Sequence, residues 1–212
     1  MSPLYPVLLD PRRVRALVVG GGAVATRKVE GLVEAGGRPA LIAPELTPEL
    51  RALVDREGLP CHLRPYREGD VAGFHLVFAA TDRPEVNARV AQEAAERGAL
   101  ASVADAGAES DFHLPASIRH DEVVVAFSTG GASPLLARRL RERLEGVVTA
   151  GVGRAARRLV EVRDRVRDRW PDDEARRRAF WFDLITPDFL ESAIEGRDEE
   201  VEARISRCLS QS

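Results

Sequence analysis

The sequence predicts an α/β protein in which a Rossmann-like parallel sheet is followed by a small α+β segment and an all-helical end. Residues 14–103 alternate short aliphatic runs with amphipathic segments, the pattern of parallel strands joined by helices. A glycine-rich turn follows the first run, as it does in Rossmann sheets. Beyond residue 112 two strand-like runs follow each other directly, and from about Val147 the pattern is helical.

The first predicted strand and helix lie on either side of the glycine turn. The aliphatic run VRALVVG, residues 14–20, predicts a buried strand. The helix after it ends at Gly36-Gly37, because glycine accepts the left-handed conformation that closes a helix. The apolar residues that recur at helical spacing are Val24, Ala25, Val29, Leu32 and Val33. We expect this face to pack on the sheet.

Two further strands with a short helix between them come next. PALIA, residues 39–43, predicts the second strand, and CHLRP, residues 61–65, predicts a weak third one. Thr47 is placed to cap the intervening helix, with Pro48 at its first position. Gly58 ends that helix.

The fourth and fifth strands complete the predicted sheet. HLVFAA, residues 75–80, is a buried strand, and LASVAD, residues 100–105, is the fifth. The segment between them, residues 84–98, is an amphipathic helix whose apolar face contains Val86, Val90 and Ala94. Five strands with helical crossovers and an early glycine turn predict a Rossmann-like sheet.

A hairpin follows the sheet in the sequence. The runs FHLPASI and EVVVAFS, residues 112–118 and 122–128, read as two strands. Their connection, residues 119–121, consists of Arg119, His120 and Asp121 and is of hairpin length.

The remainder of the chain is predicted to be helical. Ser133 caps a helix with Pro134 at its first position, and Gly146 closes it. The helices beyond residue 147 are rich in Arg, Asp and Glu. We expect their core to form around Trp170, Phe180, Trp181, Phe182 and Phe189.

The composition excludes several classes of protein. The chain has 212 residues, 44% of them hydrophobic and 31% charged, with a formal net charge of −3. These values are typical of a soluble globular protein and argue against generic nucleic-acid binding. The first residues do not read as an export signal, and no apolar run approaches the roughly 18 residues that span a bilayer. We therefore expect no membrane association.

The cysteines and histidines indicate neither a disulfide framework nor a metal centre. Cys61 and Cys208 are far apart in the sequence and belong to no ligand pattern, which fits a reducing cytoplasm. The four histidines show no metal-ligand spacing. We predict no metal ligands.

The stretch VVGGGAVATRK carries the strongest single motif. Gly20, Gly22 and Ala25 match the pattern G-x-G-x-x-A. The first glycine permits the tight turn, the second lets the backbone approach a pyrophosphate, and the third small residue lets the helix approach the strand. The helix N-terminus then offers N–H groups to the phosphates. The match is weak alone, but the required strand and helix flank it.

Residues at the ends of the second, fourth and fifth strands are further candidates. Glu45 follows the second strand, where a carboxylate accepts from ribose hydroxyls and disfavours the 2′-phosphate of NADP, so NAD is predicted. The alternative is that Glu45 begins a solvated loop. Thr81 and Asp82 follow the fourth strand; we place Thr81 at the cofactor and expect Asp82 to cap the next helix. Asp105 follows the fifth strand and is the candidate general base.

Residues 128–131, with the sequence Ser128-Thr129-Gly130-Gly131, precede the helix capped by Ser133. Two glycines and two hydroxyls next to a helix N-terminus can bind a carboxylate or phosphate of the substrate. The alternative is a flexible connection that needs glycine only to turn. Nearby arginines attract an acidic ligand or pair with Glu142 and Glu145 on a solvated face.

Two residue types occur once each. Lys28 is the only lysine among 31 basic residues, and Asn87 is the only asparagine. A residue type can occur once by chance as readily as through function, so both residues remain positions to examine.

Five segments carry a resemblance to a known family, in this order: GGGAVATRK, AATDRPEVN, SVADA, FHLPA and STGGASPLLAR. Through them the chain resembles the precorrin-2 dehydrogenase and sirohydrochlorin ferrochelatase family, which also forms the N-terminal module of siroheme synthases. The resemblance covers residues 4–146 and extends more loosely to the end. Both Lys28 and Asn87 lie inside it.

The resemblance implies NAD-dependent oxidation of precorrin-2 to sirohydrochlorin, with ferrous iron insertion as a second activity in some members. It implies that Ala23 and Val24, together with Pro44 and Glu45, contact NAD and that Asp105 is the catalytic carboxylate. It also implies a homodimer with a Rossmann domain at residues 1–112, a dimerisation and substrate domain at 113–147, and a helical domain at 148–212.

Two departures from the family pattern concern the substrate side. Many relatives have asparagine three residues before the catalytic aspartate, where this chain has Ser102, and T-D-D where it has Thr81-Asp82-Arg83. Two other functions remain open: an NAD-sensing regulatory module without catalysis, and a chelatase that does not need NAD.

Overall fold

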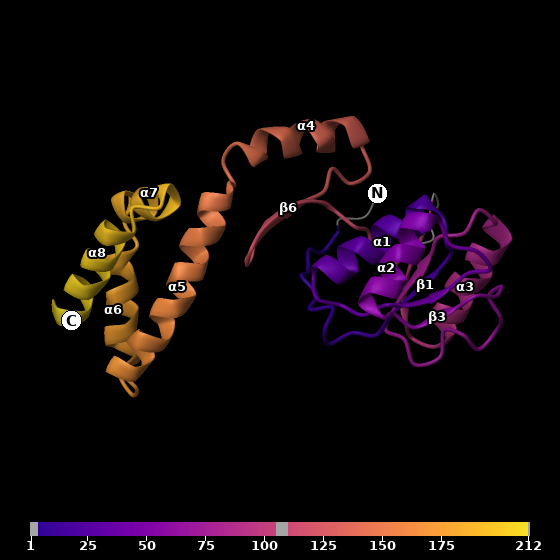
Figure 1. Cartoon of the computed structure of the whole chain (residues 1–212), viewed down its shortest axis with the longest axis horizontal. Helices are drawn as coiled ribbons and strands as arrows, with labels where there is room; N and C mark the ends of the chain where they lie inside the picture. Colours follow the sequence, from indigo (N-terminus) through magenta and orange to yellow (C-terminus); the bar gives the residue numbers. More distant parts are fainter. Residues whose placement is uncertain (1–3, 105–109, 212) are drawn as a thin grey trace. The chain divides into compact units, whose positions relative to one another are not determined.

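The computed structural model describes residues 4–104 and 110–211, which form two compact units (Figure 1). The first unit covers residues 4–114 and the second begins at residue 115. The sequence-based boundary at residue 112 lies close to this division. The further boundary at residue 147 stays a prediction.

The first unit contains a five-stranded, fully parallel sheet of order β3-β2-β1-β4-β5. The strands are β1 (Ala16–Val19), β2 (Ala40–Ile42), β3 (Cys61–His62), β4 (Leu76–Ala79) and β5 (Leu100–Val103). This order confirms the predicted Rossmann-like sheet.

Three helices cover both faces of the sheet. They are α1 (Ala23–Glu34), α2 (Pro48–Glu57) and α3 (Pro84–Glu96). Alternate residues of β1 separate the two cores: Val18 packs on the side of α1 and α2, while Leu17 and Val19 pack on the side of α3. Figure 1 shows α1 and α2 next to each other on their face. Strands buried on both faces explain the continuous aliphatic runs.

All five strands are shorter than the predicted runs, and the carboxyl ends of β3 and β5 differ most from the prediction. β3 ends at His62 because the N–H of Arg64 donates to the His62 carbonyl at 2.9 Å and turns the chain, and Pro65 has no N–H to continue a ladder. β5 ends at Val103, two residues before the predicted end.

The second unit begins with an antiparallel hairpin of β6 (Ala116–His120) and β7 (Val123–Phe127). The prediction of Arg119 and His120 as connecting residues was wrong, because both belong to β6. His120 pairs directly with Val123, so the turn has only two residues. Its first residue, Asp121, has φ 53°, a conformation that aspartate tolerates better than most residues.

Five helices follow the hairpin: α4 (Pro134–Glu145), α5 (Ala150–Arg169), α6 (Glu174–Leu184), α7 (Pro187–Glu195) and α8 (Asp198–Gln211). In α4 the Ser133 hydroxyl accepts the Leu136 N–H at 3.2 Å, which confirms the predicted cap. In the described part of the chain, no helix is both long and apolar enough to cross a membrane.

Helices α5 to α8 share one core, which includes Trp170, Phe180 and Phe189 as predicted. The prediction that Phe182 belongs to this core was wrong, since its side chain is 71% exposed. Phe180 and Leu184 are four residues apart and face the core, which places Phe182 on the opposite side of α6. There its ring lies beneath Arg178.

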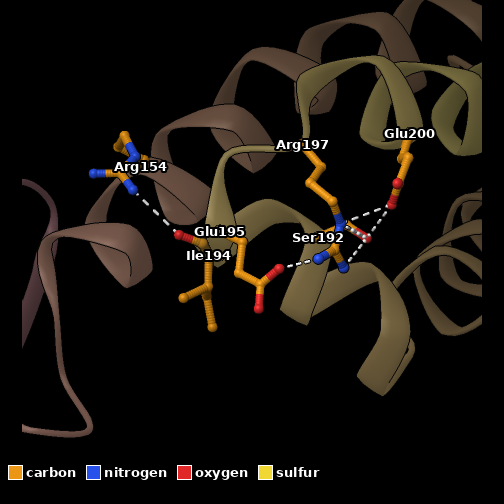
Figure 2. Close-up of polar contacts among 6 residues, drawn as sticks. All are labelled: Arg154, Ser192, Ile194, Glu195, Arg197 and Glu200. Carbon is orange, nitrogen blue, oxygen red and sulfur yellow. Dashed lines mark hydrogen bonds and ion pairs between the residues drawn. The ribbon is translucent and has the colours of Figure 1, made fainter.

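Two glycines and an arginine network hold α5 against its neighbours. A Cβ on Gly151 would lie 2.3 Å from the Ile194 carbonyl oxygen, and one on Gly153 would lie 2.8 Å from that of His120. Figure 2 shows the Arg154 guanidinium donating to the Ile194 carbonyl and Arg197 bonding to residues on both sides of the α7–α8 turn. The partners of Arg197 are Ser192, Glu195 and Glu200.

Candidate functional site

The strand order places three loops together at the carboxyl ends of β1, β2 and β4. From β1 the chain moves outward through β2 to β3, then crosses to β4 on the other side of β1. In parallel α/β sheets the crevice at such a change of direction is where ligands bind. The glycine turn, which follows β1, lies at this point.

Gly20 joins the turn to both neighbouring strands. Its N–H donates to the Ile42 carbonyl at 2.9 Å, and its φ of +131° favours glycine. A Cβ at this position would lie 2.2 Å from the Ala80 carbonyl oxygen. The protein itself therefore requires glycine here.

Gly21 is also required by the protein, although the sequence motif does not include it. A Cβ on Gly21 would lie 1.8 Å from the Glu45 carbonyl oxygen. The Gly21 carbonyl accepts the Thr47 N–H at 2.9 Å. The middle glycine of GGG was the available signal for this contact, and the spacing rule did not use it.

Gly22 differs from both, because apart from its own neighbours in the chain no described atom lies within 4 Å of the position that its Cβ would take. Its φ of −86° and ψ of −174° are allowed for any residue. Packing within the described chain therefore gives no reason for glycine at this position. The open space at this position leaves room for a ligand to approach the backbone, the role that the motif predicts for its second glycine.

The N-terminus of α1 begins at Gly22 and is suited to an anion. The Gly22 carbonyl accepts from the N–H and the hydroxyl of Thr26 at 2.9 and 3.1 Å. The first turn of α1 contains no acidic residue. Ala23 is exposed and Val24 half-buried, so the first N–H groups are accessible to phosphate oxygens.

Pro44 and Glu45 are exposed at the carboxyl end of β2. The exposed Glu45 carboxylate is accessible to the hydroxyls of a ribose, and its predicted contact with the cofactor stays a prediction. Below it the Thr47 and Thr26 hydroxyls lie 3.1 Å apart, and that of Thr47 accepts the Leu50 N–H at 3.3 Å. These contacts join α1 to the start of α2.

Thr81 lies at the carboxyl end of β4, next to Gly20. Its hydroxyl is within hydrogen-bond distance of the Asn87 amide oxygen, 2.7 Å, and of the Arg83 carbonyl, 3.1 Å. The hydroxyl also accepts the Arg83 N–H at 3.2 Å. The expectation that Asp82 caps α3 was wrong, since Arg83 occupies that position without a side-chain cap.

Asp105, the candidate base, lies outside the described residues. The residue before it, Ala104, donates its N–H to the Ala79 carbonyl at 2.9 Å at the end of β5. Ser110 and Asp111 then bond to Val103 and Ala101 of β5, each with a side-chain oxygen that accepts a backbone N–H, at 2.9 and 2.8 Å.

The predicted substrate turn, Ser128 to Gly131, belongs to the second unit. Gly130 and Gly131 have φ of 62° and 81°, so glycine is needed at both. The Ser128 hydroxyl accepts the Gly130 N–H at 3.1 Å. Ser128 and both glycines are exposed just before α4.

The arginines of α4 pair mainly with acids of the same helix. Arg138 and Arg139 both lie within 3.2 Å of Glu142, and Arg141 lies 2.9 Å from Glu145. This confirms the predicted pairing on a solvated face.

Lys28 lies half-buried on α1. Burial, and secondarily the adjacent Arg27 charge, lowers the pKa of its ammonium group. Among the described residues there is no group of three His, Cys, Asp or Glu side chains arranged to hold a metal ion.

Two protein families match the chain. The family model described as "Putative NAD(P)-binding" matches residues 7–116, which include the glycine turn and all five strands. The model described as "Sirohaem biosynthesis protein central" matches residues 125–146, which include the turn before α4 and the whole of that helix.

The sequences of several siroheme synthases align with nearly the whole chain. Siroheme synthases of Chromobacterium violaceum and Nitrosococcus oceani are 39% and 37% identical over 96% of it. The chain spans only 43% of the length of these relatives. The solved structure of SirC, a precorrin-2 dehydrogenase, matches with a TM-score of 0.79 and 25% identity over 96% of this chain and 100% of its own.

Proposed function

Because the chain belongs to the NAD(P)-binding family that matches residues 7–116, we propose that it is an NAD-dependent dehydrogenase. The proposed reaction is the oxidation of precorrin-2 to sirohydrochlorin in siroheme biosynthesis. Similarity to siroheme synthases and to a precorrin-2 dehydrogenase structure supports this choice of substrate.

The observation that carries the proposal is the contrast within the glycine turn. Gly20 and Gly21 are in close contact with neighbouring backbone, whereas Gly22 faces open space at the N-terminus of α1. An open backbone position beside accessible N–H groups fits the pyrophosphate of a dinucleotide. Gly20, Gly22, Ala23 and Val24 would contact the phosphates, and Thr81 would border them.

Glu45 supports NAD over NADP. Its exposed carboxylate stands at the end of β2, where the ribose of the adenosine lies in Rossmann proteins. Hydroxyl groups of that ribose would donate to it, and Pro44 would contact the same nucleoside. A 2′-phosphate would be repelled by the same charge.

The oxidation removes a hydride and a proton from the tetrapyrrole. NAD, when bound, supplies the hydride acceptor. The Asp105 carboxylate would accept the proton, and the Ser128 to Gly131 turn would bind a substrate carboxylate through hydroxyl and N–H donors. Ferrous iron is a proposed further substrate, for which Asp105 would accept the two pyrrole protons one after the other and pass each to solvent.

A homodimer is proposed from the surface of α4. None of the residues of α4 is buried, and Leu135, Leu136 and Leu140 are 64%, 48% and 36% exposed. A row of exposed leucines on one helix is typical of a surface that another chain covers. We propose that this surface and the hairpin form the dimerisation domain of residues 113–147, between the domains at 1–112 and 148–212, and that the protein is cytoplasmic.

The test is turnover of precorrin-2 with NAD by the wild type, Asp105→Ala and the matched control Asp82→Asn. We expect wild type and control to form sirohydrochlorin and NADH in equal amounts. Asp105→Ala should lose at least about 100-fold in rate, the smaller contribution of a general base, and keep its affinity for NAD. Sirohydrochlorin with ferrous ion tests iron insertion in the same three proteins.

Two results would contradict the proposal. An active Asp105→Ala variant would remove the base from the mechanism. A wild type that binds NAD but leaves precorrin-2 unchanged would support the regulatory NAD-sensing module instead.

A further inference from the structure

We propose that Asn87 is a positioning residue for the dinucleotide, because its amide group fixes the Thr81 backbone beside the glycine turn. The proposal rests on the proposed function, since it takes NAD as the molecule bound at that turn.

Asn87 lies on α3 and is only 5% exposed. Its amide oxygen accepts the Thr81 N–H at 3.1 Å and lies 2.7 Å from the Thr81 hydroxyl. Its amide nitrogen donates to the Thr81 carbonyl at 3.0 Å. One side chain therefore satisfies both backbone groups of a single residue.

The Asn87 amide pairs the backbone groups that a neighbouring strand would otherwise pair, at the point where the chain leaves the sheet after β4. The last sheet-like bond of this segment joins the Ala80 N–H to the Val19 carbonyl at 2.8 Å. The next residue, Thr81, has its backbone groups paired by Asn87 instead. The acceptor and the donor stand on two separate atoms of one short side chain, as an amide provides; an ionised carboxylate has no donor, and a hydroxyl has only one polar atom.

The Thr81 backbone is in turn packed on the glycine turn. The Cβ position of Gly20 lies 2.2 Å from the Ala80 carbonyl oxygen and 3.1 Å from the Thr81 nitrogen. A shift of Thr81 therefore displaces Gly20 or opens a gap beside it. Either change alters the position of Thr81 relative to Gly22, which follows Gly20 by two residues and caps the N-terminus of α1.

Glu93 provides a matched comparison on the same helix. It is also 5% exposed, and it accepts the Gly69 N–H at 2.9 Å and a hydrogen bond from the Arg97 guanidinium at 2.6 Å, while the Tyr66 hydroxyl donates to it. These partners hold the segment before β4 and include no residue of the glycine turn. A loss at Glu93 therefore lowers stability without moving the cofactor loops.

The experiment measures the Kd for NAD by calorimetry and the Tm by scanning in full-length wild type, Asn87→Ala, Asn87→Asp and Glu93→Gln. We expect Asn87→Ala to raise the Kd about tenfold, the effect of one or two lost hydrogen bonds. Asn87→Asp keeps the acceptor and the size but loses the donor, so it should raise the Kd about threefold. Glu93→Gln should lower the Tm and leave the Kd within about twofold.

A purely structural role for Asn87 predicts that its variants lower the Tm and leave the Kd for NAD unchanged. The proposal is overturned if both Asn87 variants melt at lower temperature yet bind NAD with the wild-type Kd well below their Tm. The isosteric Asn87→Asp variant decides the matter if Asn87→Ala does not fold. A wild type that binds NAD without oxidising precorrin-2 would refute the proposed function and not this role of Asn87.

Discussion

The glycine turn and helix α4 differ in how completely one chain packs them. At the turn, Gly20 and Gly21 touch backbone of two neighbouring loops, and hydroxyl and amide side chains join those loops to α1 and α3. On α4, by contrast, none of the residues is buried, and three leucines are exposed. The hairpin before α4 contributes one buried side chain, Ile118.

This difference indicates that one chain suffices for cofactor binding but not for the stability of the α4 surface. The loops that would hold the dinucleotide are positioned by contacts within the first unit, so cofactor binding should not depend on association. No residue of α4 is buried by the described part of the second unit, so the stability of this surface and any function of the adjacent Ser128 to Gly131 turn should depend on a second copy.

The largest effect is expected from Gly21→Ala. The added Cβ would lie 1.8 Å from the Glu45 carbonyl oxygen, and backbone cannot move away as a flexible side chain does. We expect a loss of about 2–3 kcal/mol in the free energy of unfolding, the upper range for overpacking. Urea denaturation of the full chain measures it. A loss below about 0.5 kcal/mol would show that the loops are less closely packed than described.

The α4 surface is tested by Leu136→Glu and Leu140→Glu. Each should raise the dimer dissociation constant at least about tenfold, because a buried leucine contributes about 1.5–3 kcal/mol. Sedimentation at several concentrations measures this, and Arg143→Ala on the same helix is the control. A wild type that remains monomeric, or glutamate variants that dimerise like the control, would contradict the proposed surface.

A smaller effect, confined to the first unit, is expected from Asp70→Asn. The Arg64 guanidinium donates two hydrogen bonds of 2.7 Å to this carboxylate, and they hold its pKa below the ordinary value. A lowered pKa stabilises the folded state above the unfolded pKa of about 3.9, and that stability is lost as the pH falls through the folded value.

Asp70→Asn should therefore be less stable than wild type by about 1 kcal/mol at pH 7, the typical net contribution of a hydrogen bond within a protein. The difference should shrink as the pH falls below about 4. Denaturant titrations between neutral and acid pH measure it. A difference that stays constant over this range would remove the ionised pair as its cause. NAD affinity should not change, because neither Asp70 nor its partner Arg64 contacts the glycine turn.

Much of the fold could be predicted because local chemistry determines it. Aliphatic runs bounded by glycine predicted all five strands, and Thr47 and Ser133 both cap helices as their sequence contexts indicate. The errors arose where tertiary pairing decides the boundary. His120 belongs to a strand because Val123 faces it, and Phe182 is exposed because Phe180 and Leu184 take the core side of α6.

The candidate site could be predicted in its position but not in its packing. The motif identified Gly20 and Gly22, and the strand ends identified Glu45 and Thr81. The requirement for Gly21 depends on the Glu45 carbonyl, which lies across a loop, and spacing along the sequence does not reveal such contacts. The sequence marks Asn87 as the single asparagine and as part of the family resemblance, but its three bonds to Thr81 depend on the fold and are not evident from the sequence.

The most direct test of the account is Gly22→Ala, measured for both stability and NAD affinity. No described atom would meet the new Cβ, and the backbone conformation suits alanine, so the Tm should stay near the wild-type value. The same methyl group would lie where the pyrophosphate approaches, so the Kd for NAD should rise at least about tenfold. An unchanged Kd at an unchanged Tm would contradict the claim that Gly22 is present for the dinucleotide.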